Sequence, residues 1–122
     1  MPYADTDFFI ALLKESDWLS KKAERILAEN KGSLWTSNWT LVETLLLCQE
    51  FGLDPEIVTL SIAELARVEG DMNQILMAAH MMKKFKMKTF DALHAASCGS
   101  DTIISSDSIF EKAGLKRIPL EK

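Results

Sequence analysis

The sequence predicts an α/β fold: a three-layer α/β/α sandwich in which helices cover both faces of a central parallel sheet. Short apolar or β-branched runs alternate with helix-length segments along the chain, which is typical of right-handed crossover units. Several acidic residues also fall where the expected strands end, the edge at which parallel sheets bind ligands. The 122 residues suffice for one domain with a substantial core, and neither a linker nor a repeat interrupts them.

Each expected element has a local reason in the sequence. Glycines at positions 32, 52, 99 and 114 end helices, Pro55 suits a first helical turn, and Ser37 or Asn38 and Thr89 are suitable N-caps. Pro119 restricts the last strand to an edge of the sheet. The expected order is strand 3–5, helix 7–14, helix 17–30, strand 33–36, helix 38–51, helix 56–68, helix 71–84, helix 90–98, strand 102–105, helix 108–113 and strand 115–120.

Composition narrows the class of protein. Apolar residues make up 48% of the chain, but no uninterrupted apolar run approaches the roughly 20 residues of a membrane span, so we expect a cytoplasmic protein. Cys48 and Cys98 lack paired-ligand spacing and are expected to be buried, reduced thiols. The net charge of −4 does not exclude a nucleic-acid partner, because setting aside four candidate site carboxylates leaves 14 acidic against 14 basic residues.

Those four carboxylates are the main functional signal. Asp5 and Asp107 follow strands, Asp91 opens a helix, and Glu43 lies inside one, with Trp39, Leu46 and Leu47 as helical neighbours. Each aspartate alone has an ordinary alternative as a helix cap worth about 1 kcal/mol. Glu43 cannot be an N-cap, and burial of its carboxylate is costly unless it is paired or metal-bound.

A cluster of all four carboxylates would favour a hard divalent cation. Two carboxylates 4 Å apart repel each other by about 4 kcal/mol at an effective dielectric constant near 20, so the group must stay partly protonated or hold cations. All-oxygen ligands select Mg²⁺ or Mn²⁺ over zinc, and such a site suits phosphodiester hydrolysis. The chain has neither a Ser/His/Asp set at usable spacing nor a glycine-rich phosphate loop.

The same segments resemble the PIN domain, in the small form typical of virulence-associated toxin ribonucleases of prokaryotes. The resemblance rests on residues 3–7 (Tyr-Ala-Asp-Thr-Asp), the helix with Glu43, residues 90–96 (Phe-Asp-Ala-Leu-His-Ala-Ala) and residues 103–110 (Ile-Ile-Ser-Ser-Asp-Ser-Ile-Phe). It implies a single nuclease domain over residues 1–122, Mg²⁺- or Mn²⁺-dependent cleavage of RNA, and frequently a homodimer blocked by an antitoxin.

The resemblance also assigns roles to residues. It implies that Asp5, Glu43, Asp91 and Asp107 are the catalytic metal ligands, with Thr6 and Ser105 as hydroxyls that hold them. Many relatives have asparagine in place of Asp7 and a further acid in place of Ile109, and the latter difference weakens a second metal site. For Asp7 we favour helix capping over a place in the site.

Together with the carboxylates, the resemblance implies a metal-dependent endoribonuclease, the toxin of a type II toxin-antitoxin pair. The alternatives are an RNA-processing or DNA-directed nuclease of the same family, and a non-catalytic RNA-binding or protein-interaction module.

Two further features have alternatives that the sequence leaves open. A basic run consisting of Lys83, Lys84, Lys86 and Lys88 precedes Asp91, and it serves either as a set of RNA-phosphate contacts or as a solvated surface. His94, one turn after Asp91, either touches the phosphate, orients a ligand or is a bystander, and the last is favoured because a single histidine is weak evidence.

Overall fold

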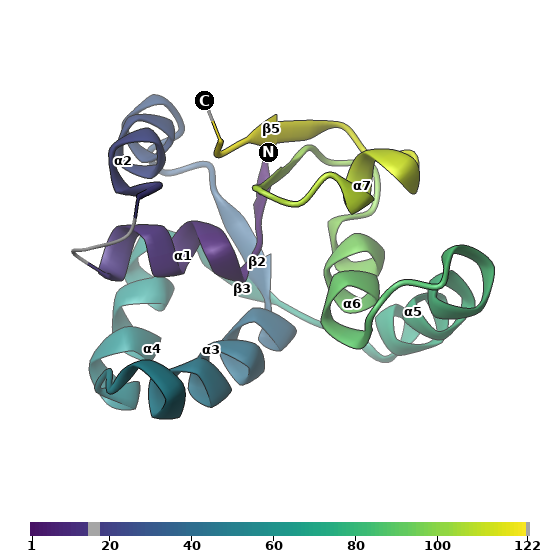
Figure 1. Cartoon of the computed structure of the whole chain (residues 1–122), viewed down its shortest axis with the longest axis horizontal. Helices are drawn as coiled ribbons and strands as arrows, with labels where there is room; N and C mark the ends of the chain where they lie inside the picture. Colours follow the sequence, from purple (N-terminus) through teal and green to yellow (C-terminus); the bar gives the residue numbers. More distant parts are fainter. Residues whose placement is uncertain (15–17, 122) are drawn as a thin grey trace.

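The structure, a computed structural model, describes residues 1–14 and 18–121, apart from the side chain of Met72. Its elements alternate between strands and helices as the sequence predicts (Figure 1). In chain order they are β1 (Tyr3–Ala4), α1 (Thr6–Leu13), α2 (Ser20–Glu29), β2 (Trp35–Ser37), α3 (Asn38–Phe51), α4 (Pro55–Leu65), β3 (Arg67–Glu69), α5 (Met72–Phe85), α6 (Thr89–Cys98), β4 (Ile103–Ser105), α7 (Ile109–Lys112) and β5 (Arg117–Pro119).

The five strands form one sheet in the order β3-β2-β1-β4-β5, and every neighbouring pair is parallel. Strand β1 lies in the middle, where Tyr3 is opposite both Trp35 and Ile103. Because all strands point the same way, their carboxyl ends meet at one edge of the sheet. That edge carries the candidate site.

Adjacent residues on the central strands point to opposite faces and belong to two separate cores. Ala4 and Ile104 pack with α1, α2, α3 and α4, whereas Tyr3 and Ile103 pack with α5, α6 and α7. Figure 1 shows these two groups of helices on opposite sides of the sheet. The predicted α/β/α sandwich is therefore confirmed.

The structure departs from the sequence prediction at several boundaries. The helix expected over residues 56–68 ends at Leu65, and the next residues form β3, which the sequence analysis missed. Only Val68 of this three-residue edge strand is even partly buried, so it has little apolar pattern to detect. Lys88, not Thr89, is the N-cap of α6, and no side chain caps that helix. The predicted start of the second helix falls partly outside the described residues.

The structure also bears on the expected state of the cysteines and on membrane spans. Cys48 and Cys98 are buried, free thiols, as predicted. Among the described residues, none of the helices has the length and apolar character needed to cross a membrane.

Candidate active site

The candidate site lies at the carboxyl edge of the sheet, because that is where the central strands end. Asp5 directly follows β1, and Ser106 and Asp107 directly follow β4, which is paired with β1. Helix α3 contributes Glu43 and helix α6 contributes Asp91. Segments from four parts of the chain thus converge on one place.

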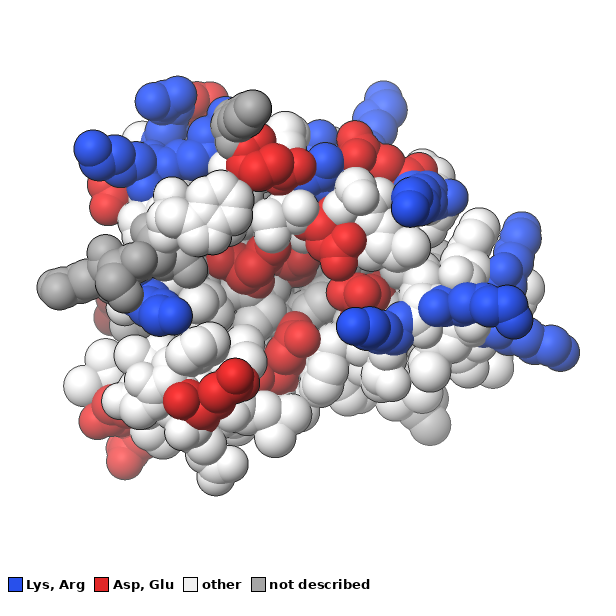
Figure 2. Space-filling model, viewed as in Figure 1, with Lys and Arg blue, Asp and Glu red and all other residues white. Residues whose placement is uncertain are grey.

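These segments surround a cavity of about 330 Å³. Figure 2 shows acidic side chains gathered across the middle of this face. One part of the lining is carboxylate and the other is apolar, with Phe51 at its edge under the Lys14 ammonium, 4.1 Å from the ring centroid. The lining residues are Asp5, Thr6, Asp7, Ile10, Glu43, Leu47, Phe51, Asp91, His94, Ser106 and Asp107. All four carboxylates proposed from the sequence therefore line the same cavity.

Asp5 is the most deeply placed of these acids, only 6% exposed. Its side chain caps α1 by accepting a hydrogen bond from the backbone N–H of Asp7, 3.2 Å away. Burial raises the pKa of the Asp5 carboxyl well above its usual range, and the nearby charge of Asp7 raises it further. A hydrogen bond from Ser105 lowers this pKa, which fits the supporting role assigned to that hydroxyl.

Asp7 has a different place from the one we favoured. Asp5 is the N-cap of α1, so Asp7 is not, and Asp7 lines the cavity instead. Its Oδ2 accepts hydrogen bonds from the backbone N–H of Ser106, 2.9 Å away, and from the Ser106 hydroxyl. Its Oδ1 is buried and has no hydrogen-bond partner within the described structure. Ser106 could not be identified from the sequence, because its role depends on a contact between distant segments.

Asp91 and Asp107 both line the cavity and are close enough for their charges to interact. Burial, followed by the charge of Asp107, raises the pKa of the Asp91 carboxyl, while Lys88 acts in the opposite direction. Asp107 is exposed, and its Oδ1 accepts the backbone N–H of Ile109 at 2.9 Å. It therefore bonds the turn that leads into α7, whose N-cap is Ser108 and not Asp107, while it also lines the cavity.

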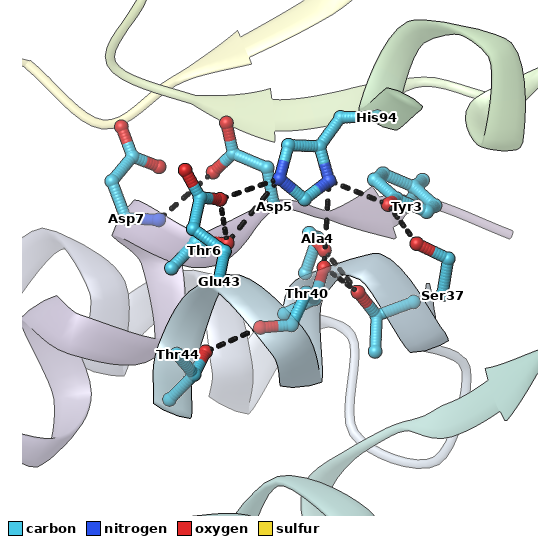
Figure 3. A network of polar contacts seen from close by, with 11 residues as sticks. Tyr3, Ala4, Asp5, Thr6, Asp7, Ser37, Thr40, Glu43, Thr44 and His94 are labelled. Atoms are coloured by element: carbon cyan, nitrogen blue, oxygen red, sulfur yellow. Dashed lines mark hydrogen bonds and ion pairs between the residues drawn. The ribbon is translucent and has the colours of Figure 1, made fainter. Parts of the chain in front are cut away.

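Glu43 is held by two donors from other elements (Figure 3). Its Oε1 accepts a hydrogen bond from the Thr6 hydroxyl and another from His94 Nε2, 2.8 Å away. The side chain is 25% exposed, so it borders the core without being enclosed by it. The apolar neighbours expected on this helix are only partly buried: Leu47 lines the cavity, but Leu46 is 57% exposed.

The lysine run does not surround the cavity as a unit. All four lysines are exposed, but only Lys88 acts on the site, by lowering the pKa of Asp91. Lys83 lines a separate apolar hollow on α5, and Lys84 packs against Phe85, 5.3 Å from its ring centroid. Lysines in Figure 2 accordingly extend away from the acidic centre along the α5 side.

A hard divalent cation fits the donor set chemically. Burial, and after it neighbouring negative charge, raises the pKa values of Asp5 and Asp91, and Asp7 offers a buried oxygen without a partner in the described structure. As the described side chains stand, no three carboxylate, imidazole or thiol groups are close enough to share one metal ion. The cavity carboxylates would have to move closer together to share one cation.

Comparison with known proteins adds the family. A model of the PIN domain matches residues 3–116. No curated protein matches the chain.

Several solved structures share the fold. The toxin VapC20 of Mycobacterium tuberculosis, described as cleaving the sarcin-ricin loop, is 23% identical with a TM-score of 0.81, over 94% of this chain and 96% of its own. A toxin-antitoxin complex from Klebsiella pneumoniae is 14% identical with a TM-score of 0.76, over 100% and 99%. VapBC2 from Rickettsia felis, bound to a promoter DNA fragment, is 13% identical with a TM-score of 0.70, over 98% of both chains.

Proposed function

The chain belongs to the PIN domain family, and from that premise we propose that it is a Mg²⁺- or Mn²⁺-dependent endoribonuclease, acting as the toxin of a type II toxin-antitoxin pair. In this proposal residues 1–122 act as a single nuclease domain in the cytoplasm. The structural neighbours that are toxins, or complexes of toxins with antitoxins, support the toxin assignment.

The observation that carries the proposal is the convergence of five carboxylates on one cavity at the carboxyl edge of a parallel sheet. Such a concentration of negative charge repels an RNA phosphate unless cations neutralise it. The carboxylates also provide only oxygen donors, the type that Mg²⁺ and Mn²⁺ prefer.

The proposed roles follow from position. Asp5, Glu43, Asp91 and Asp107 would hold the metal, and Asp7 is added to them for its buried oxygen, which has no partner in the described part of the chain. A bound divalent cation supplies charge neutralisation and activation of a water for attack on the phosphodiester. Thr6 and Ser105 hold carboxylates in place, and Lys88 contributes positive charge beside Asp91 for a phosphate oxygen.

Partners are also part of the proposal. Exposed apolar side chains on α3 and α4 and on α5 provide two surfaces for an antitoxin and for a second copy of the chain. The first surface contains Val42, Leu45, Leu46, Ile57 and Leu60, and the second contains Ile75, Leu76, Met77 and Met82. A non-catalytic module has no use for the acidic cavity, which is why catalysis is preferred.

The test is cleavage of RNA by the purified protein with Mg²⁺, with Mn²⁺ and with chelator, followed by sequencing of the new RNA ends. We expect cleavage only with the metals, and ends that map to a few sites. Undiminished cleavage in chelator would overturn the metal dependence. Cleavage of DNA but not of RNA would favour the DNA-directed alternative.

A further inference from the structure

Behind Glu43, buried polar side chains form a continuous chain that ends at the cavity (Figure 3). His94 is 2% exposed: its Nε2 faces Glu43 and the Thr6 hydroxyl, 3.2 Å away, and its Nδ1 faces Tyr3 and the Thr40 hydroxyl, 3.4 Å away. Its Nε2 is 2.8 Å from Glu43 Oε1, and its Nδ1 is 2.7 Å from the Tyr3 hydroxyl. The Tyr3 hydroxyl is in turn 2.7 Å from Ser37 Oγ.

The direction of the hydrogen bonds follows from the acceptor at the cavity end. An ionised carboxylate only accepts, so His94 Nε2 carries a proton and donates it to Glu43. In the neutral imidazole Nδ1 then accepts from the Tyr3 hydroxyl, and the tyrosine oxygen accepts from Ser37. Burial raises the pKa of Tyr3, so the phenol keeps the proton that this arrangement requires.

Ser37 provides independent support for this chain. It occupies the N-cap position of α3, where a serine side chain ordinarily bonds the helix backbone and contributes about 1 kcal/mol. Here its side chain makes no capping bond and turns to Tyr3 instead. The Ser37 side chain therefore contacts and orients Tyr3 instead of capping α3.

The result is an asymmetric environment for the Glu43 carboxylate. Within the described structure, its two side-chain donors, from Thr6 and His94, both reach Oε1. Holding one oxygen fixes the carboxylate plane and leaves Oε2 for another partner. Groups that orient a metal ligand in this way usually change metal affinity 10–100-fold when they are removed.

We propose that His94 is a positioning residue, which holds Glu43 in the orientation that binds a divalent cation. Tyr3 and Ser37 fix the imidazole from its other side. The proposal rests on the proposed function, because it assumes that Glu43 is a metal ligand, and it assigns a role to a histidine for which the sequence favoured none.

Two substitutions at His94 separate positioning from simple packing. His94→Gln keeps an amide N–H near the place of Nε2, whereas His94→Asn is shorter and reaches only toward Tyr3. Tyr3→Phe removes the hydroxyl behind the imidazole without touching the cavity. Thr44→Val is the matched control, since Thr44 is a buried hydroxyl on the same helix as Glu43 that bonds only the Thr40 carbonyl, 2.6 Å away, among the described residues.

The experiment is calorimetric titration of Mn²⁺ into each purified, RNA-free variant, with circular dichroism to verify folding. We expect His94→Asn to weaken Mn²⁺ binding about 10–100-fold, His94→Gln to recover most of it, and Tyr3→Phe to weaken it by a smaller factor. Thr44→Val should keep the affinity of the unsubstituted protein, even with a lower melting temperature.

The outcomes distinguish the positioning role of His94 from the proposed metal dependence. Equal Mn²⁺ affinity for the unsubstituted protein, His94→Asn and Tyr3→Phe would overturn the positioning role alone. No Mn²⁺ binding by the unsubstituted protein would overturn the proposed metal dependence as well. If His94→Asn does not fold, two other measurements decide whether His94 positions Glu43. One is the Mn²⁺ affinity of Tyr3→Phe, and the other is long-range proton–nitrogen NMR correlation of the two imidazoles. These should show a fixed Nε2–H tautomer for His94 and averaging for the exposed His80.

Discussion

Two hollows of this surface differ in size and in chemistry. The hollow on α5 is the larger, about 740 Å³, and is lined by residues such as Leu76, Met77 and His80, with no carboxylate. The hollow at the strand ends is about 330 Å³ and contains five. The larger one leaves apolar side chains uncovered. The smaller one gathers carboxylates, and burial together with neighbouring charge raises the pKa values of Asp5 and Asp91. The energetic cost of gathering carboxylates, more than the volume of a hollow, therefore indicates the candidate site of chemistry.

The largest expected difference between the hollows concerns catalysis. Asp5→Asn, Glu43→Gln and Asp91→Asn should each lower the rate of RNA cleavage at least about a hundredfold, because a neutral amide removes several kcal/mol of charge stabilisation. Asp107→Asn should be milder, since this exposed ligand is partly replaceable by water. Single-turnover rates in Mg²⁺ measure these losses.

Glu50→Gln is the matched control, because Glu50 is an exposed acid on the same helix as Glu43. Its rate should stay within about twofold of the unsubstituted protein, as for most surface substitutions. An equal loss of activity in Glu50→Gln would mean that the net charge of the protein, and not the carboxylates of the cavity, determines the rate of RNA cleavage.

The apolar hollow should respond in the opposite way. Leu76 is 73% exposed, so Leu76→Asp should leave folding and single-turnover cleavage nearly unchanged. We expect it to weaken self-association at least about tenfold, because a charge at the centre of an apolar interface is poorly solvated. Sedimentation across a concentration series checks this, and an unsubstituted protein that stays monomeric at high concentration would contradict it.

The lysine run connects the two hollows and offers a finer comparison. Lys88 acts on Asp91, whereas Lys83 lines the apolar hollow. RNA binding can be measured without cleavage in a protein that carries Glu43→Gln. In that protein, Lys88→Ala should weaken RNA binding a few-fold and reduce the slope of log affinity against log salt concentration by about one. Lys83→Ala should change both quantities less. Equal effects, measured by fluorescence anisotropy across salt concentrations, would assign the whole run to one surface.

The sequence predicted the sandwich and the four candidate carboxylates because these depend on local patterns. Strand ends and helix starts are visible in residue order, so Asp5, Asp91 and Asp107 could be placed before their neighbours were known. Glu43 was identified because a glutamate within an apolar helix needs a partner. The family's motif order then joined the four.

Other features depend on contacts between distant segments and could not be predicted. Asp7 was assigned to capping because a turn signal looks the same whether its carboxylate meets solvent or Ser106, 99 positions away in the chain. The role of His94 was undervalued because its partners Tyr3 and Glu43 lie 91 and 51 positions away. Strand β3 was missed because three mostly exposed residues carry little periodic signal.

The smallest effect concerns stability, where the cost of the acidic cavity should appear directly. A carboxyl whose pKa is raised in the folded state favours folding only when protonated, so ionised Asp5 destabilises the protein at neutral pH. Asparagine is as good an N-cap as aspartate, so Asp5→Asn should keep the cap of α1 and raise the melting temperature in chelator. About 1 kcal/mol corresponds to roughly 3–5 °C for a domain of this size.

The pH dependence of the stability difference between Asp5→Asn and the unsubstituted protein provides a control. As the pH falls from 7 through the raised pKa of Asp5, the unsubstituted protein becomes protonated there and the difference should shrink, vanishing near the ordinary aspartate pKa of about 3.9. Glu43→Gln should gain less than Asp5→Asn, because Glu43 already receives hydrogen bonds from Thr6 and His94.

Melting curves of the unsubstituted protein and Asp5→Asn, each in chelator and then in Mg²⁺, test most directly whether these carboxylates are assembled for a cation. We expect Asp5→Asn to be the more stable in chelator and the less stable in Mg²⁺, since saturating metal at a hundredfold excess over its dissociation constant adds about 2.7 kcal/mol only to the protein that binds it. An Asp5→Asn variant less stable than the unsubstituted protein in chelator, or equal stabilisation of both by Mg²⁺, would contradict a metal site built around Asp5.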